Sequence, residues 1–288
     1  MEEIMSLLFE TNAFKISNPD HPFWATSGKL TPYYINTHFL YGSQADAEAL
    51  LDYINEQLES EERVKIPQNV FKKVFEQYTT NRIYKTITDL LIEYLKSHID
   101  IDEVDYISGG ERRDWYFSMM VAYLLKKPHI TIYKDVTAIE SSYDFETNSQ
   151  QANFDNKNIL HVADLLTVAS SFVRAWIPAV QDLGGNLKWA LVVVDRNQGG
   201  PEVLAEHDVK ALSLFKIDEH FFDKALELGK INQNQLELLK AYTADPDGTM
   251  KQFLIDHPTF VEDTLNGSDE KAAKRAKLLV EGNLYGLN

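Results

Sequence analysis

Residues 159–171 read Ile159-Leu160-His161-Val162-Ala163-Asp164-Leu165-Leu166-Thr167-Val168-Ala169-Ser170-Ser171. The apolar start predicts a buried strand, and the hydroxyl-rich end predicts a turn that opens a helix. Such a turn gathers backbone N–H groups and hydroxyl groups where a phosphate binds favourably. The stretch therefore predicts an α/β fold with a phosphate-binding loop at the carboxyl end of a strand.

Four positions of this stretch are candidate binding residues. Asp164 ends the predicted strand, where it can reach a sugar hydroxyl or a magnesium-bound water. Thr167, Ser170 and Ser171 add hydroxyl donors to the turn. The alternative reading is an ordinary strand-to-helix connection, in which these hydroxyl groups cap the helix.

Short apolar strands alternate with helices over much of the chain. We expect strands at 104–107, 130–133, 159–162, 189–194 and 211–215, and helices at 45–58, 70–98, 115–125, 172–183 and 201–207. The alternation predicts a mainly parallel sheet flanked by helices, with ligands bound at the carboxyl ends of the strands. Loops 108–114, 134–157, 164–171 and 195–200 all follow such ends.

The C-terminal part of the chain differs from this alternating pattern. From residue 218 the sequence reads as helices, with a turn at 245–248 and a charged helical end at 271–279. We therefore expect an α/β domain over residues 1–217, which includes the N-terminal segment, and a helical extension over residues 218–288.

Composition excludes several classes of function. The chain has no cysteine, so disulfides, thiolate metal sites and a cysteine nucleophile are excluded. A net charge of −16 argues against binding to nucleic acid, whose phosphates repel an acidic surface. No apolar run approaches the roughly 20 residues that span a bilayer, and the acidic opening is unlike a signal peptide. We expect a cytoplasmic protein that binds neither nucleic acid nor membrane.

The stretch at 159–171 resembles the ribose-phosphate loop of type I phosphoribosyltransferases, in which two acidic residues follow an apolar strand and precede Thr and Gly. Ala163 takes the place of the first acidic residue and Ala169 that of the glycine. If position 169 needs a left-handed backbone, alanine costs about 1–2 kcal/mol. Segments 26–36, 106–115 and 191–200 resemble, in the same chain order, those of orotate phosphoribosyltransferase.

The resemblance implies a reaction and a set of site residues. It implies Mg²⁺-dependent transfer of ribose 5-phosphate from phosphoribosyl pyrophosphate to a nucleobase, with orotate or a related pyrimidine as acceptor. Asp164 then binds the metal ion and the ribose hydroxyls, and the loop from Thr167 through Ala169 to Ser171 binds the 5-phosphate. The residues assigned to pyrophosphate are Gly109 and Gly110, through their backbone N–H groups, and the cations Arg112, Arg113 and Lys134.

The acceptor base is assigned to two other segments. Arg196 follows an apolar strand and is a candidate bidentate clamp on a carboxylate or carbonyl, held by Asp195. Thr26, Tyr33 and Tyr34 lie in the segment that resembles a hood over the base. Without the resemblance, the two tyrosines would be read as core residues, and Arg196 as a surface residue that opens a turn.

The segment after Lys134 departs from the family pattern. Residues 136–156 contain no Lys, Arg, His or Gly, whereas the family has cationic residues there and one of them reaches a partner subunit's active site. The family pattern implies a homodimer, and loss of a donor of this kind typically costs about 10²- to 10³-fold in rate. Three functions remain open: a divergent transferase, a non-catalytic sensor of phosphoribosyl pyrophosphate or a nucleotide, and a scaffold whose C-terminal helices bind a partner.

Histidines are poor catalytic candidates in this sequence. They are scattered and show no metal-ligand spacing, and His161 lies inside an apolar strand, where a packed neutral ring is expected.

Overall fold

A computed structural model describes residues 2–150 and 153–287, so Met1, Gln151, Ala152 and Asn288 lie outside the described residues. The chain divides into two compact units. The first consists of Met1–Ala13 and Asn36–Asp218, and the second of Phe14–Ile35 and Glu219–Asn288. Within the described ranges, none of the helices combines the length and the apolar character needed to cross a membrane.

A seven-stranded sheet forms the centre of the first unit, in the order β11-β10-β9-β5-β6-β7-β8. Its strands are β5 (Tyr106–Gly110), β6 (His129–Ile132), β7 (Ala138–Ser141), β8 (Asn148–Ser149), β9 (Asn158–Leu166), β10 (Asn186–Asp195) and β11 (Lys210–Lys216). The strands from β11 to β6 are parallel, while β7 and β8 add an antiparallel edge. The predicted α/β class with a mainly parallel sheet is confirmed.

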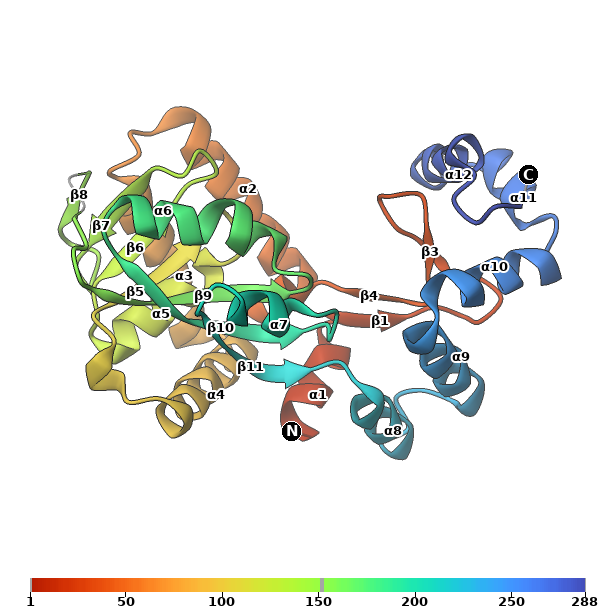
Figure 1. Ribbon diagram of the computed structural model, residues 1–288, viewed down its shortest axis with the longest axis horizontal. Helices are drawn as coiled ribbons and strands as arrows, with labels where there is room; N and C mark the ends of the chain where they lie inside the picture. Colours follow the sequence, from red (N-terminus) through yellow and green to blue (C-terminus); the bar gives the residue numbers. More distant parts are fainter. Residues whose placement is uncertain (1, 151–152, 288) are drawn as a thin grey trace. The chain divides into compact units, whose positions relative to one another are not determined.

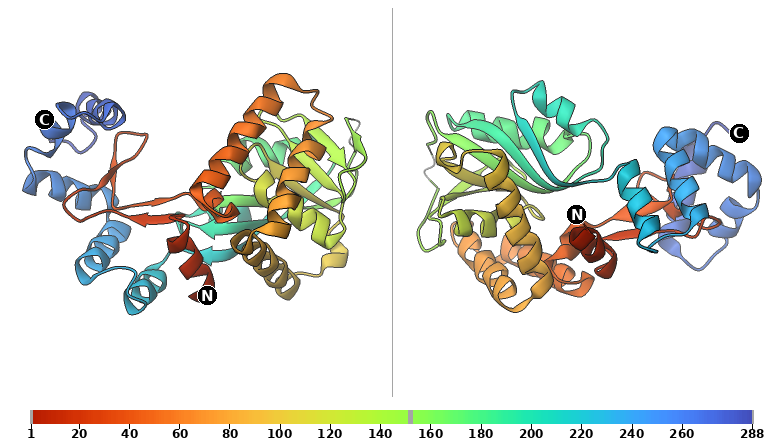
Figure 2. Two further views of the ribbon diagram at one scale, coloured as in Figure 1. Left: turned by 180° about the vertical axis from the view of Figure 1, so that it is seen from behind. Right: turned by 90° about the horizontal axis from the view of Figure 1, so that it is seen from below.

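Helices cover both faces of this sheet (Figures 1 and 2). The helices of the first unit are α1 (Glu2–Glu10), η1 (Thr37–Tyr41), α2 (Gln44–Ser60), α3 (Ile66–Thr80), α4 (Arg82–His98), η2 (Ile101–Glu103), α5 (Trp115–Leu125), η3 (Phe172–Trp176), α6 (Ile177–Asp182) and α7 (Gly200–Ala205). Helices α4 and α5 pack on one face, and η3, α6 and α7 on the other. The chain crosses from β5 to β6 in one direction and from β9 to β10 in the other. The order therefore reverses between β5 and β9, where doubly wound sheets bind ligands.

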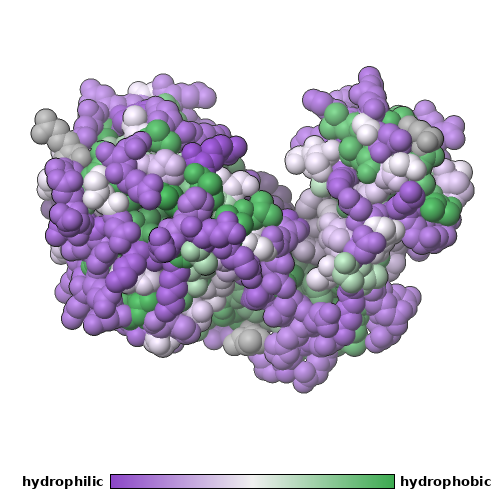
Figure 3. Space-filling view, viewed as in Figure 1, coloured by the Kyte–Doolittle hydropathy of each residue, from purple (hydrophilic) through white to green (hydrophobic). Residues whose placement is uncertain are grey.

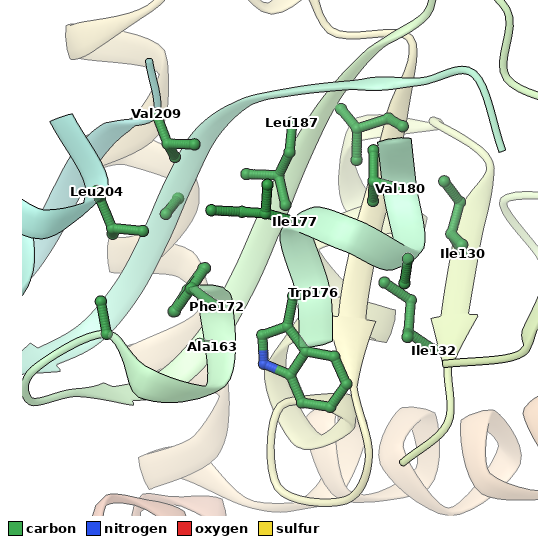
Figure 4. Close-up of a cluster of buried hydrophobic side chains, with 14 of the residues drawn as sticks. Ile130, Ile132, Ala163, Phe172, Trp176, Ile177, Val180, Leu187, Leu204 and Val209 are labelled. Atoms are coloured by element: carbon green, nitrogen blue, oxygen red, sulfur yellow. The ribbon is translucent and has the colours of Figure 1, made fainter. Parts of the chain in front are cut away.

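The core on the η3 and α6 side is shown in Figure 4. Phe172, Trp176 and Ile177 lie against β9 and β10, with Leu187 and Leu204 in the same cluster. On β10, the side chains of residues 191–194 are all 0% exposed, because the strand is covered on both faces. The visible outer surface of each unit is mostly hydrophilic, as expected for a net charge of −16 (Figure 3).

Two predicted segments of the first unit differ in the structure. The single helix expected at 70–98 is broken at Asn81, whose backbone is extended and whose side chain accepts the N–H of Tyr84 at 3.1 Å, as an N-cap. The expected loop at 134–157 contains β7 and β8, which were missed because they are short. Ile139 is buried while its neighbours on β7 are partly exposed, which is the alternation of an edge strand.

The second unit joins two distant parts of the sequence. Its strands are β1 (Phe14–Ile16), β2 (Phe23–Trp24), β3 (Leu30–Thr31) and β4 (Tyr33–Ile35), and its helices are α8 (Glu219–Glu227), α9 (Gln233–Ala244), α10 (Pro246–Asp256), α11 (Phe260–Leu265) and α12 (Glu270–Gly282). Trp24 and Leu30 share a core with Phe253 and Leu279. The N–H of Leu30 donates to the hydroxyl of Tyr285 at 2.8 Å.

These contacts correct the predicted domain boundary. The N-terminal segment Phe14–Ile35 was assigned to the α/β domain, but it groups with the C-terminal helices because its apolar side chains are buried among them. The predicted turn at 245–248 is instead the start of α10, where the Asp245 side chain caps the helix by accepting the N–H of Gly248 at 2.9 Å.

Candidate functional site

A pocket of about 380 Å³ lies in the first unit, where β5, β6 and β9 end. Its lining includes the predicted residues Arg112, Arg113, Lys134, Asp164 and Ser171. Their three loops are far apart in sequence and are brought together because parallel strands present their carboxyl ends at one edge of the sheet. The size falls in the range of small-molecule sites.

The cations of this pocket come from two strand ends. Arg112 and Arg113 follow β5, and Lys134 follows β6. The Arg112 guanidinium donates a hydrogen bond to the Asn55 side-chain oxygen, so α2 holds it in place. Burial, with a smaller contribution from the Arg113 charge, lowers the pKa of His38 to about 3, so this histidine is neutral near pH 7.

Two aspartates, Asp114 and Asp164, also line this pocket and lie close together. Asp164 is half-buried and lies within β9, which continues to Leu166, whereas the sequence predicted it at the strand's end. The Asp114 carboxylate accepts the backbone N–H of Asp164 at 3.1 Å. Burial and the Asp114 charge raise the pKa of Asp164 to about 7, against the opposing effect of Arg113. Because the two carboxyl groups lie close together, the charge on one makes ionisation of the other less favourable.

Asp114 was missed by the sequence reasoning, although it ends the same charged loop as Arg113. Its Oδ2 accepts the backbone N–H of Gly110 at 3.2 Å and lies 3.4 Å from Nε2 of His161. Nδ1 of that histidine lies 2.9 Å from the Ser108 hydroxyl. The expected burial of His161 is confirmed, but the ring also links a serine to Asp114 beneath the pocket.

The structure gives Gly109 and Gly110 a packing role, and their assignment to pyrophosphate stays a prediction. Both are buried in β5, and the N–H of Gly110 is already given to Asp114. A Cβ at Gly109 would lie 2.1 Å from the Ser118 hydroxyl, and one at Gly110 would lie 2.2 Å from the Trp176 ring. These glycines allow α5 and η3 to pack closely against β5.

The phosphate-loop candidates lie beside the pocket. Ser171 lines it, while Thr167, Ala169 and Ser170 belong to the same loop without lining it. Ala169 has a φ of +55°, which is the left-handed conformation that glycine adopts without strain. Position 169 therefore has the kind of backbone at which alanine is strained.

Ala169→Gly is expected to stabilise the protein by about 1 kcal/mol, because glycine adopts a positive φ without the clash of a Cβ atom. Urea denaturation measures the change. The matched control is Ala49→Gly on an exposed position of helix α2, which is expected to destabilise by about 1 kcal/mol. Equal losses at both positions would contradict the strain at Ala169.

The base-binding candidates are not in this pocket's lining. Arg196 follows β10, and its backbone N–H donates to Leu166 at 2.9 Å, while the Asp195 carboxylate accepts the N–H of Asn197 at 2.8 Å. Thr26, Tyr33 and Tyr34 belong to the second unit.

The two tyrosines have packing roles in that unit. Tyr33 is 4% exposed and stacks on Phe14, so it packs in the core of the second unit, and its assignment to the base stays a prediction. Tyr34 stacks on Phe23, and its hydroxyl donates to the Trp24 carbonyl.

The pocket fits Mg²⁺ only in part. Among residues 2–150 and 153–287, no group of three or more His, Cys, Asp or Glu side chains is placed to hold a metal ion. Mg²⁺ commonly uses one or two carboxylates and completes its shell with waters and substrate phosphates. Asp164, with Asp114 beside it, matches that donor set, because a divalent cation would favour the ionised form that the site otherwise disfavours.

Known proteins with similar sequences include several phosphoribosyltransferases. No family model matches the chain. The orotate phosphoribosyltransferase of Methanosphaera stadtmanae is 26% identical over 133 residues, covering 46% of this chain and 72% of that protein. That of Saccharolobus solfataricus is 28% identical over 159 residues, covering 55% and 77%. That of Halobacterium salinarum is 33% identical over 94 residues, covering 33% of this chain and 47% of the relative, which is less than half its length.

Solved structures agree in fold. The orotate phosphoribosyltransferase from Aeropyrum pernix has a TM-score of 0.52 at 18% identity, covering 80% of this chain and 99% of that chain. The enzyme from Francisella tularensis has a TM-score of 0.54 at 13% identity, covering 83% and 96%. At these identities the structures establish the fold, and the sequence matches identify the relatives. The chain is therefore similar in sequence to orotate phosphoribosyltransferases, and its fold is the one that those enzymes have.

Proposed function

We propose that the chain transfers ribose 5-phosphate from phosphoribosyl pyrophosphate to a nucleobase. The observation that carries the proposal is the pocket at the sheet's switch point, which is lined by Arg112, Arg113 and Lys134 together with Asp164. The three cations would bind the negatively charged pyrophosphate. The loop at 167–171 follows the strand that carries Asp164, which is the arrangement that 5-phosphate binding needs. The similarity to orotate and adenine phosphoribosyltransferases supports the transferase class.

In the proposed reaction, a ring nitrogen of the base forms a bond to the anomeric carbon of the ribose. The bond from that carbon to a pyrophosphate oxygen breaks, its electron pair leaves with pyrophosphate, and the base nitrogen loses its proton. Arg112, Arg113 and Lys134 stabilise the negative charge of the leaving group, while Asp164 orients the ribose hydroxyls. Bound Mg²⁺ would neutralise part of the pyrophosphate charge, with Asp164 as its protein ligand.

A pyrimidine such as orotate is the acceptor we propose. The support is the similarity to several orotate phosphoribosyltransferases and the presence of Arg196 on the loop after β10, next to β9 in the sheet. A guanidinium matches the carboxylate of orotate in a bidentate geometry.

A sensor that binds phosphoribosyl pyrophosphate without transferring it is the second candidate. Two features favour it: Ala163 replaces an acidic residue of the family's loop, and residues 138–141 are paired in β7 rather than forming an open lid. A closing lid normally excludes water and completes the catalytic site.

Calorimetric titration with phosphoribosyl pyrophosphate, with and without Mg²⁺, tests binding first. We expect micromolar or tighter binding that needs the metal. The complex is then offered orotate, uracil, adenine and guanine while pyrophosphate release is followed. Release with orotate supports the proposal and names the base, and binding without release with any base selects the sensor. Absence of binding overturns both.

A further inference from the structure

Glu111 lies in the pocket among the cations that we assign to pyrophosphate. It follows β5 directly, and its side chain is only 9% exposed. Its Oε1 is 3.7 Å from Nε of Arg112 and 3.7 Å from Nζ of Lys134. Its Oε2 accepts the backbone N–H of Lys134 at 3.2 Å. Two of the three pocket cations therefore already face a carboxylate of the chain itself.

The position of Arg112 does not depend on this carboxylate alone. Arg112 is held separately by the side chain of Asn55. Both ion-pair distances exceed the 2.7–3.2 Å range of N–H···O hydrogen bonds. Arg112 Nε and Lys134 Nζ therefore attract the Glu111 carboxylate by charge, without a direct hydrogen bond to it.

A ligand anion and the Glu111 carboxylate would meet the same positive charges. In a pocket that is partly shielded from water, like charges brought close together cost free energy. A ligand pyrophosphate must either stay near this carboxylate or displace it from Arg112 and Lys134. In both cases binding is weaker than the three cations alone would give.

We infer that Glu111 is an internal competitor for pyrophosphate, which sets a weak affinity for the leaving group and promotes its release. The inference rests on the proposed function of the pocket, because it assigns these cations to a pyrophosphate group. Glu111 opposes pyrophosphate binding, whereas Arg112, Arg113 and Lys134 favour it. The Glu111 carboxylate balances Arg112 and Lys134 in the unliganded protein, and it yields them when the ligand arrives.

Glu111→Gln tests this directly, since the amide oxygen can still accept the N–H of Lys134 while the charge is removed. Calorimetry with inorganic pyrophosphate and with phosphoribosyl pyrophosphate, both with Mg²⁺, gives the affinities. We expect the variant to bind both at least about tenfold more tightly than the wild type. The matched control is Glu103→Gln, which breaks an ion pair with Lys188 at 2.7 Å outside the pocket and should leave both affinities unchanged.

The outcomes separate this inference from the proposed function. Equal or weaker pyrophosphate binding by Glu111→Gln overturns the inference, because Glu111 would then organise the cations. Tighter pyrophosphate binding, with no binding of phosphoribosyl pyrophosphate by either protein, supports the competitor and overturns the transferase. If the variant melts earlier than the wild type, Glu111→Asp, which withdraws the carboxylate by one methylene, provides a second variant with the same expected direction.

Discussion

Asp164→Asn is expected to weaken Mg²⁺-dependent binding of phosphoribosyl pyrophosphate by about 100-fold or more. Asparagine keeps the shape and the backbone bond to Asp114, but it lacks the charge that would bind the metal and orient the ribose. Calorimetry with and without Mg²⁺ measures the loss. Asp89→Asn, at a surface ion pair with Lys85, is the control and should bind like the wild type. Wild-type affinity in Asp164→Asn would remove this residue from the site.

The same variant is expected to be more stable than the wild type when no ligand is present. The Asp164 carboxyl has a folded-state pKa of about 7, raised from 3.8 by burial and by Asp114. The folded state therefore holds this proton more tightly than the unfolded chain, and the wild-type free energy of unfolding falls as pH rises from about 4 to about 7. Asparagine does not titrate and avoids that loss.

Urea denaturation in the presence of EDTA measures this second effect. After allowance for solvent at the half-buried carboxyl, we expect Asp164→Asn to gain about 1–2 kcal/mol at about pH 8 and nothing at about pH 4. A gain of equal size at both pH values would show that the carboxyl charge is not its cause. Stability gained together with binding lost is the pattern of a group kept for function at a cost to the fold.

Much of this site could be predicted from residues that lie close together in the sequence. The stretch at 159–171 was sufficient to place a strand and a loop, and the family's glycine position anticipated the left-handed backbone of Ala169. The alternation of strands and helices predicted that Arg112, Lys134 and Asp164 would meet at one edge of the sheet. Such features depend on residues close in sequence, or on the general geometry of parallel sheets.

Features that depend on distant pairs could not be read in the same way. Asp114 acts on Asp164 because β5 lies next to β9, and no pattern around either residue states that neighbour. The grouping of Phe14–Ile35 with Glu219–Asn288 rests on strands of two or three residues, which are too short to show a period. The sequence predicts that Gly109 and Gly110 bind pyrophosphate, but glycine serves close packing equally well, and only the packed neighbours distinguish the two uses.

Gly110→Ala tests that distinction, and we expect it to destabilise the protein by about 3 kcal/mol. The backbone of Gly110 is not left-handed, so alanine meets no conformational penalty there. Its Cβ would lie 2.2 Å from the Trp176 ring, which is 7% exposed and packed against His161. Because an aromatic ring cannot bend away, the helix that carries it must move. Urea denaturation measures the loss.

Trp176→Leu is the background that isolates the cause. In that background we expect Gly110→Ala to cost less than about 1 kcal/mol, because the smaller side chain leaves room for the methyl group. The double variant should also bind pyrophosphate with the affinity of Trp176→Leu alone, since the N–H of Gly110 is given to Asp114 and not to a ligand. An undiminished cost in the Trp176→Leu background would show that the clash is not with the indole. A loss of pyrophosphate binding confined to the double variant would return Gly110 to the phosphate site.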